Sequence, residues 1–249
     1  MLHLGLLRQL HPHPDRATET PDWPLRFQAL AGTARDHRLQ AFYAAGAVTG
    51  DTPMSAVPLM ALDVETTGLD PVKDGIVSIG LVPMRLDRIF ASKSRHWILK
   101  PRAPLAAKSV TIHGITDSQI ESAPDLIDIL DEMLHAIAGH VVVVHCRALE
   151  RQFLTGALRT RIGETIEFPV IDTMELEARL YRKKHPGLIA RLFGHRQVSI
   201  RLAASRGRYG LPRYRPHHAL TDALASAELL QAQIAHRFSP DTPLSTLWK

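Results

Sequence analysis

Two carboxylates stand two residues apart at the end of an apolar run. Residues 59–62 have the composition of a buried strand, and Asp63 and Glu65 follow them before Gly68 turns the chain. Side chains i and i+2 of a strand point to one face, about 7 Å apart along the chain. Two like charges at a buried strand end repel each other and lose hydration, and a divalent cation relieves both costs. The pair indicates a metal site, although a surface strand that runs into a polar turn has the same short pattern.

Two further acids and a histidine extend this set. Glu150 precedes apolar residues at helical spacings of three, four and seven, so we expect it on the inward face of a helix. The alternative is a surface acid paired with Arg147 or Arg151. Asp222 stands in the first turn of the last long helix, five residues after His217. An acid is also favourable there simply because of the helix dipole.

Read together, these stretches resemble the DEDDh 3′–5′ exonucleases, a family that includes the proofreading subunit of bacterial replicative polymerases and several RNA-trimming enzymes. The first motif is DVETTGLD, which begins at Asp63, and the third is HHALTDA, which begins at His217. The second motif begins at His145 and departs from the family pattern, because Cys146 stands for Asn and Glu150 for Asp. The resemblance covers roughly residues 57–235.

The resemblance implies a metal-dependent 3′–5′ exonuclease that hydrolyses DNA and/or RNA to nucleoside 5′-monophosphates. It implies two divalent cations, Mg²⁺ or Mn²⁺, whose hard character suits carboxylate oxygens. By this resemblance Asp63 bridges both ions, while Glu65 and Asp222 complete the first site. Glu150 holds the second ion, directly or through water. His217 is the general base, because an imidazole titrates near neutral pH.

The same resemblance implies residues that meet the substrate. His113, in the segment TIHGIT, corresponds to the part that lines the pocket for the terminal nucleotide. Thr66 and the backbone around Thr67 meet the terminal sugar. A single histidine in a loop is also commonly just hydrated, which is the alternative for His113. The second histidine of the third motif, His218, is expected to be incidental.

A basic segment leads to the expected general base. Residues 179–218 contain no Asp or Glu and carry eleven of the chain's 30 Lys and Arg residues. We expect this segment to bring phosphates to the carboxylates and its Tyr209 and Tyr214 to stack on bases. The alternative is a solvated basic face. The arginines expected to bind phosphate are Arg206, Arg208, Arg213 and Arg215.

The elements that must position these residues alternate between strands and helices. Apolar runs and turn residues predict strands over residues 59–64, 76–85, 90–99, 141–145 and 168–172. Helical periodicity predicts helices over residues 124–139, 149–162, 172–182, 199–209 and 219–236. This alternation indicates an α/β protein with a mixed sheet flanked by helices. It agrees with the ribonuclease-H-like fold that the resemblance implies.

The chain divides by composition into three parts. Residues 1–57 are expected to form a helical N-terminal extension and linker, with short helices at 25–34 and 38–45. Residues 58–240 are expected to form the exonuclease domain, and residues 241–249 a C-terminal tail.

Composition excludes some classes of protein. The apolar fraction of 45% is ordinary for a globular protein, and no apolar run approaches the length of a membrane span. The single cysteine, Cys146, excludes an internal disulfide and fits a reducing cytoplasm. The first residues lack the pattern of a signal peptide. We therefore expect a cytoplasmic protein that binds nucleic acid and no membrane.

Two other functions fit the same residues. The departures at Cys146 and Glu150 allow a nucleic-acid-binding module that has lost its chemistry. A proofreading factor that associates with a polymerase, or a homodimer, is the other alternative, with the N-terminal extension as the docking segment.

Overall fold

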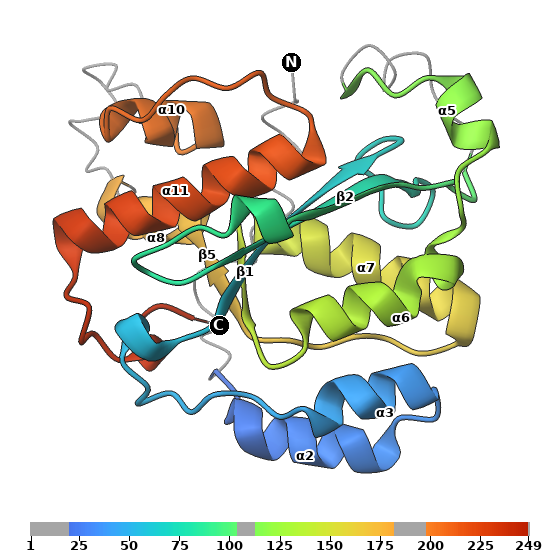
Figure 1. Cartoon of the computed structure of the whole chain (residues 1–249), viewed down its shortest axis with the longest axis horizontal. Coiled ribbons are helices and arrows are strands. Elements are labelled where there is room, and N and C mark those ends of the chain that lie inside the picture. Colours follow the sequence, from blue (N-terminus) through green and yellow to red (C-terminus); the bar gives the residue numbers. More distant parts are fainter. Residues whose placement is uncertain (1–19, 104–112, 182–197, 249) are drawn as a thin grey trace, which may run out of the picture.

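A five-stranded mixed sheet forms the centre of this computed structural model, which describes residues 20–103, 113–181 and 198–248 (Figure 1). The strand order is β3-β2-β1-β4-β5. Strand β1 pairs antiparallel with β2 and parallel with β4, so the predicted mixed sheet is confirmed. The strands are β1 (Leu59–Thr66), β2 (Ile76–Met84), β3 (Arg95–Ile98), β4 (Val141–Val144) and β5 (Val170–Asp172).

Helices cover both faces of this sheet. Helix α11 (Ala219–Arg237) crosses one face over β1 and β2, and α6 (Leu126–Ile137) and α7 (Arg147–Ile162) lie on the other side (Figure 1). Helix α6 begins with a capping box made by Asp125 and Asp128. All six apolar residues of its predicted inward face are buried, namely Leu126, Ile129, Leu130, Met133, Leu134 and Ile137.

The remaining helices match the predicted ones closely. Helix α8 (Thr173–Tyr181) follows β5, and α10 (Leu202–Arg208) precedes α11; the short α5 (Asp117–Glu121) precedes α6. Strand β4 is four valines, all fully buried, as expected for a strand covered on both faces.

The third predicted strand is partly wrong. Residues 90–99 were expected to be extended, but Ala91–Lys93 forms a 3₁₀ turn and only Arg95–Ile98 pairs with β2. The Phe90 N–H donates to the Pro83 carbonyl at 2.9 Å, which closes the chain back onto the end of β2. Residues 90–93 therefore turn back toward β2 and do not continue β3, although their apolar pattern predicted an extended strand.

The N-terminal helices pack on the same core as the sheet. Helices α2 (Trp23–Thr33) and α3 (His37–Ala44) bury an aromatic cluster in which the Phe27 and Tyr43 rings lie 5.2 Å apart edge to face. The Arg26 guanidinium pairs with Glu167, which precedes β5. The division of the chain at residue 57 stays a prediction, but these helices bury part of the sheet's own core.

The predicted linker and tail are packed together. Within residues 47–58, Met54 and Val57 are fully buried, and Met54–Ala56 forms a 3₁₀ turn. The Met54 N–H donates to the Thr242 carbonyl at 3.1 Å, and the Ser55 N–H donates to the Pro240 carbonyl at 2.9 Å. Backbone hydrogen bonds therefore join this segment to the C-terminal segment, and the division into linker, domain and tail stays a prediction.

Candidate active site

The end of β1 presents Asp63 and Glu65 toward α11. Asp63 is paired with Gly80 and Glu65 with Ser78 across the antiparallel β1–β2 ladder. Residues directly opposite each other in a ladder share a face, so all four residues belong to the α11 side of the sheet. The two carboxylates therefore share one face, as their spacing predicted.

A glycine lets the start of α11 approach this strand end. A Cβ added to Gly80 would lie 2.4 Å from the carbonyl carbon of Ala219, which is the first residue of α11. No side chain fits in this space, since real Cβ contacts lie beyond 3.0 Å. The absence of a side chain at position 80 thus decides how close the third motif comes to the first.

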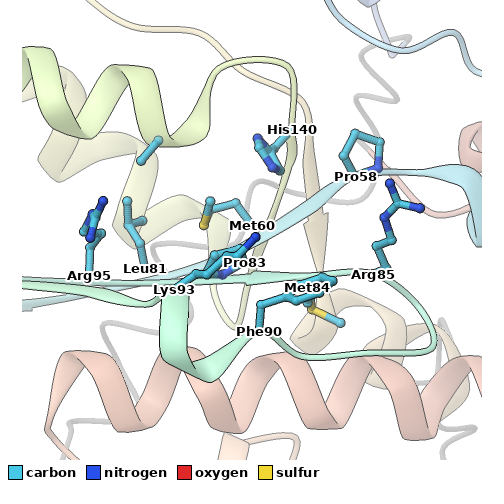
Figure 2. Close-up of a pocket in the computed structure, with 11 residues that line it drawn as sticks. Pro58, Met60, Leu81, Pro83, Met84, Arg85, Phe90, Lys93, Arg95 and His140 are labelled. Atoms are coloured by element: carbon cyan, nitrogen blue, oxygen red, sulfur yellow. The ribbon is translucent and has the colours of Figure 1, made fainter.

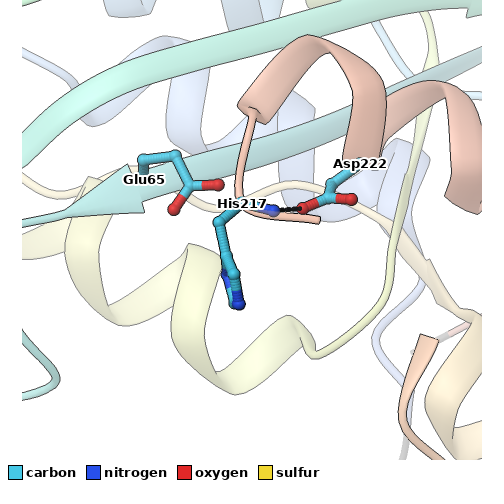
Figure 3. A group of neighbouring side chains, drawn as sticks. All are labelled: Glu65, His217 and Asp222. Carbon is cyan, nitrogen blue, oxygen red and sulfur yellow. Dashed lines mark hydrogen bonds between the residues drawn. The ribbon is translucent and has the colours of Figure 1, made fainter. Parts of the chain in front are cut away.

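This approach brings three predicted site residues together. Single ligand atoms of Glu65, His217 and Asp222 lie within 4.8 Å of one another (Figure 3). The His217 N–H donates to Asp222 Oδ2 at 2.7 Å, the bond drawn as a dashed line. His217 has φ of +67°, a left-handed conformation that a residue with a side chain adopts at some cost. The carboxylate of Asp222 holds the backbone of His217 in that conformation.

Glu150 lies inside the protein, near the first motif. It stands in the first turn of α7 and is only 3% exposed, and its Oε2 has no hydrogen-bond partner among the described side chains and backbone. The surface pairing with Arg147 or Arg151 is wrong, because Arg147 pairs with Glu175 and Arg151 donates to the Phe168 carbonyl at 2.8 Å. A buried carboxylate oxygen without a partner is costly, which indicates a ligand at this point.

Burial raises the pKa of all four acids, and neighbouring acids add to the shift at Asp63 and Glu65. Burial, followed by the charges of Glu65, Asp222 and Glu150, raises the pKa of Asp63 well above its ordinary value. Burial and the charge of Asp222 raise the pKa of Glu65 to about 8. Burial also raises the pKa of Glu150 and of Asp222, although the His217 N–H acts in the opposite direction on Asp222. A divalent cation would offset both the lost hydration and the repulsion, so this donor set of hard oxygens fits Mg²⁺ or Mn²⁺.

His113 faces the same site from a separate loop. It lines a pocket of about 120 Å³ together with Glu65 and His217. Its Nδ1 accepts a hydrogen bond from the Ile115 N–H at 3.0 Å, while its buried Nε2 has no partner among the described atoms. A buried imidazole nitrogen without a partner, on a residue that lines a pocket, is a candidate to bind a ligand. The alternative of a merely hydrated loop histidine is therefore disfavoured.

The two threonines of the first motif differ. Thr67 is buried; its N–H donates to the Gly75 carbonyl at 2.9 Å and its hydroxyl donates to Asp74 Oδ1 at 3.1 Å. These bonds hold the loop after β1, so its N–H and hydroxyl are already used. Thr66 is half-buried and its hydroxyl donates to the Gly68 carbonyl. A contact of either residue with a sugar stays a prediction.

The basic segment divides into structural and exposed arginines. Arg206 is 3% exposed, bonds the Ala225 carbonyl at 2.7 Å and pairs with Glu228 at 2.7 Å. Arg208 pairs with the buried Glu177. Both were expected to bind phosphate, and this is wrong because their charges are neutralised inside the protein. Arg213 and Arg215 are exposed on the loop that leads to α11.

The two tyrosines of this segment that were expected to stack on bases form hydrogen bonds within the protein. The Tyr209 hydroxyl donates to Glu177 Oε1 at 2.9 Å, and the Tyr214 hydroxyl donates to Glu228 Oε1 at 2.8 Å. These rings support the contacts of α10 with α8 and α11. The part of the basic segment at residues 182–197 lies outside the described residues.

Sequence reasoning missed two histidines at this site. His218 was expected to be incidental, but its Nδ1 accepts from the Thr221 N–H at 3.4 Å and so caps α11. The His96 ring from β3 lies 4.7 Å from the His218 ring, centroid to centroid. Both line the pocket that holds Glu65 and His113. No local signal marks His96, because only the β2–β3 pairing brings it here.

The larger pocket of the structure lies elsewhere. A cavity of about 410 Å³ is lined by Met60 and Leu81 of the sheet and by Ala136 of α6 (Figure 2). Met60 is three residues from Asp63 on β1, so the two side chains point to opposite faces of the sheet. This cavity therefore belongs to the α6 face and contains none of the site acids.

A mixed sheet of this order, with carboxylates gathered at one strand end, is the architecture of the ribonuclease-H-like nucleases. The family model described as RNase_T, Exonuclease, matches residues 60–230. The chain belongs to this exonuclease family and is of the DEDDh type. The family generally uses divalent metal ions, which agrees with the cluster of Glu65, His217 and Asp222.

The curated relatives carry names that refer to DNA polymerase III. The chain is 29% identical over 182 residues to a DNA polymerase III PolC-type of Thermotoga maritima, covering 73% of this chain and 12% of that relative. It is 29% identical over 179 residues to a DNA polymerase III subunit epsilon-like protein of Rhodobacter capsulatus, covering 72% of this chain and 24% of the relative. The chain thus spans a quarter or less of the length of these two relatives.

Solved structures share the fold. Exonuclease X in complex with 5′ overhanging duplex DNA aligns with a TM-score of 0.55 and 22% identity, over 75% of this chain and 97% of that one. The nuclease domain of 3′hExo, described as a DEDDh family member bound to rAMP, aligns with a TM-score of 0.60 and 15% identity, over 72% and 92%. No helix among the described residues has the length and apolar character to span a membrane.

Proposed function

We propose that this chain is a metal-dependent 3′–5′ exonuclease that releases nucleoside 5′-monophosphates from DNA or RNA. One observation carries the proposal: acids from three separate elements gather at the end of β1, with Glu65 and Asp222 beside His217. Asp63 and Glu65 come from β1, Glu150 from α7 and Asp222 from α11. The raised pKa of Asp63, caused by burial and by the charges of Glu65, Asp222 and Glu150, supports this proposal.

These acids fit two divalent cations, Mg²⁺ or Mn²⁺. Asp63 has the charges of Glu65, Asp222 and Glu150 around it, so it is the residue we assign to both ions. Glu65 and Asp222 would hold the first ion, and the unpartnered Oε2 of Glu150 would hold the second. Bound cations supply charge stabilisation for the attacking and leaving oxygens of a phosphodiester.

His217 is the group we assign to proton removal from the attacking water. Its backbone is held by Asp222 at the cluster, and an imidazole is suited to general base catalysis near neutral pH. His113 Nε2 would bond the terminal nucleotide from within the neighbouring pocket. Thr66 and the backbone around Thr67 are assigned to the sugar, and Arg213 and Arg215 to phosphates further along the strand. The exposure of both arginines supports this assignment.

The test is a gel assay with 5′-labelled single-stranded and duplex DNA and RNA in Mg²⁺, Mn²⁺ or EDTA. Wild type should shorten the strand stepwise in metal and leave it intact in EDTA. Asp63→Asn should abolish cleavage, whereas Asp87→Asn, at an exposed turn, should not. A 3′-phosphate should block degradation and a 5′-phosphate should not. Undiminished turnover in Asp63→Asn sinks the proposal, and retained binding without any metal-dependent product favours a module that has lost its chemistry.

The polymerase relatives support a second proposal, that the chain proofreads with a polymerase partner. Proofreading predicts faster removal of a mismatched than of a paired 3′ nucleotide once the polymerase is added. Gel filtration of the chain with a replicative polymerase from the same organism measures the association. Elution of the chain at the same volume with and without the polymerase contradicts this proposal.

A further inference from the structure

The conformation of His217 needs support from its surroundings. Its φ of +67° is the only positive φ among the described residues other than glycine. Such a conformation costs on the order of 1–3 kcal/mol and persists only where neighbours over-determine it. The bond from the His217 N–H to Asp222 holds one side of the residue, and the next residue, His218, holds the other.

His218 is fixed at both its backbone and its ring. It is the N-cap of α11, with extended backbone, and its Nδ1 accepts from the Thr221 N–H at 3.4 Å. Its ring lies over the His96 ring, with centroids 4.7 Å apart and an interplanar angle of 34°. The rings are tilted relative to each other, and their centroid separation lies in the range of attractive aromatic contacts. The ring contact therefore connects the start of α11 to β3.

His96 is itself anchored to the sheet. Its Nε2 is hydrogen-bonded to the Ser78 hydroxyl at 2.8 Å, and Ser78 is 1% exposed. Ser78 lies directly opposite Glu65 in the β1–β2 ladder. A connected path thus runs from the strand that carries Glu65, through Ser78 and His96, to His218.

We propose that His96 and His218 are positioning residues, which hold the neighbouring His217 in the orientation needed for hydrolysis by fastening the loop before α11 to the sheet. The proposal rests on the exonuclease function above. It assigns a role to His96, which lies outside all three motifs. The His96 ring contacts the His218 ring and so limits the movement of residues 217 and 218.

The experiment compares the steady-state kcat and KM of wild type, His96→Ala, His96→Phe and His218→Asn. His96→Ala should lower kcat by about 10- to 100-fold with little change in KM, because a displacement near 1 Å of a catalytic group has effects of this size. His96→Phe keeps a ring against His218 and should recover most of the loss. His218→Asn keeps a good N-cap but no ring, so it should resemble His96→Ala. His135→Ala, at an exposed histidine of α6, is the control and should match wild type.

The pair should also be coupled. In a double-mutant cycle, His96→Ala and His218→Ala should be clearly non-additive in kcat, since each removes the same contact. The position of the His217 backbone N–H signal in NMR spectra, measured in EDTA, should shift in His96→Ala and return toward wild type in His96→Phe. This readout needs no activity and reports directly on the held segment.

The outcomes separate the two proposals. A wild type that cleaves nothing in Mg²⁺ or Mn²⁺ overturns the exonuclease function, and the His217 N–H signal alone then decides whether His96 positions the segment. An active wild type with unchanged kcat in His96→Ala overturns the positioning role only. Strict additivity in the cycle, or an unmoved His217 signal, also overturns it.

Discussion

Replacing Gly80 by alanine should separate the third motif from the first. A Cβ at this position would lie 2.4 Å from the Ala219 carbonyl carbon and 2.5 Å from both its oxygen and the Leu220 nitrogen. Ordinary contacts begin at 3.4 Å, so the start of α11 would have to move by about 1.0 Å. All three atoms belong to backbone, so no side chain can rotate away to relieve the contact. The segment that moves is the one that carries Asp222 and follows His217.

The size of the effect follows from this displacement. Adding a methyl group to a filled site costs typically about 1–3 kcal/mol of folding stability. The ligand atoms of Glu65, His217 and Asp222 now lie within 4.8 Å of one another, and a shift near 1 Å opens this group. Displacements of that size reduce catalysis by about 100-fold. We therefore expect turnover to fall about 100-fold, which corresponds to about 2.7 kcal/mol in the activation free energy and is similar in size to the loss of folding stability.

The assay combines urea unfolding with single-turnover hydrolysis of one oligonucleotide over a range of Mn²⁺ concentrations. Gly80→Ala should unfold at lower urea, need more Mn²⁺ and cleave about 100-fold more slowly. Gly32→Ala in α2, where a Cβ meets nothing within 4 Å, is the control and should keep full activity. Activity of Gly80→Ala within twofold of wild type, at unchanged stability, would falsify the claim that this close approach positions the site.

Three further predictions test separate parts of the site. Glu150→Gln should lower kcat by orders of magnitude with little effect on affinity, while Glu150→Asp should keep substantial activity; a Gln variant equal to wild type at every metal concentration contradicts the assignment. Because burial raises the pKa of Glu65 from 4.5 to about 8, the folded protein retains a proton that the unfolded chain loses. In EDTA the Tm should thus fall as pH rises from about 4.5 to 8. Glu65→Gln should flatten this decline, Mn²⁺ should raise the Tm more at pH 8 than at pH 5, and identical slopes in both proteins refute the reasoning. Replacing Arg213 and Arg215 by alanine should reduce the slope of log K against log salt by up to about 1.4 for a single strand. Arg159→Ala is the control for this slope, and an unchanged slope in the double variant makes the pair a solvated surface.

Local sequence alone determined those features of this protein that depend only on residues close together in the chain. The apolar run before Asp63, the spacing from Asp63 to Glu65 and the inward register of Glu150 all act within one element. The spacing of residues along a strand or a helix is sufficient to predict which side chains lie on one face of that element. The apolar stripe of α6 was predictable for the same reason, and all its members are buried.

Only the tertiary structure decided which charged and aromatic groups meet across elements. Arg206 and Arg208 belong by sequence to a basic surface, yet Glu228 of α11 and Glu177 of α8 neutralise them. The choice between a surface and an interior ion pair depends on partners distant in the chain, which composition does not reveal. For the same reason His96 carries no signal in the sequence.

The geometry of the site depends on both the local sequence and the tertiary structure. The chain encodes its acids in three short motifs, but their distances follow from one sheet pairing and one glycine. Asp63 faces Gly80 because β1 and β2 pair in this register, and the bare backbone at Gly80 admits the start of α11. The type of each side chain follows from the local sequence, whereas the distance between two backbones depends on the packing of whole elements. That is why the sequence could predict that Glu65, His217 and Asp222 lie together, whereas the contact of His96 with His218 could not be predicted.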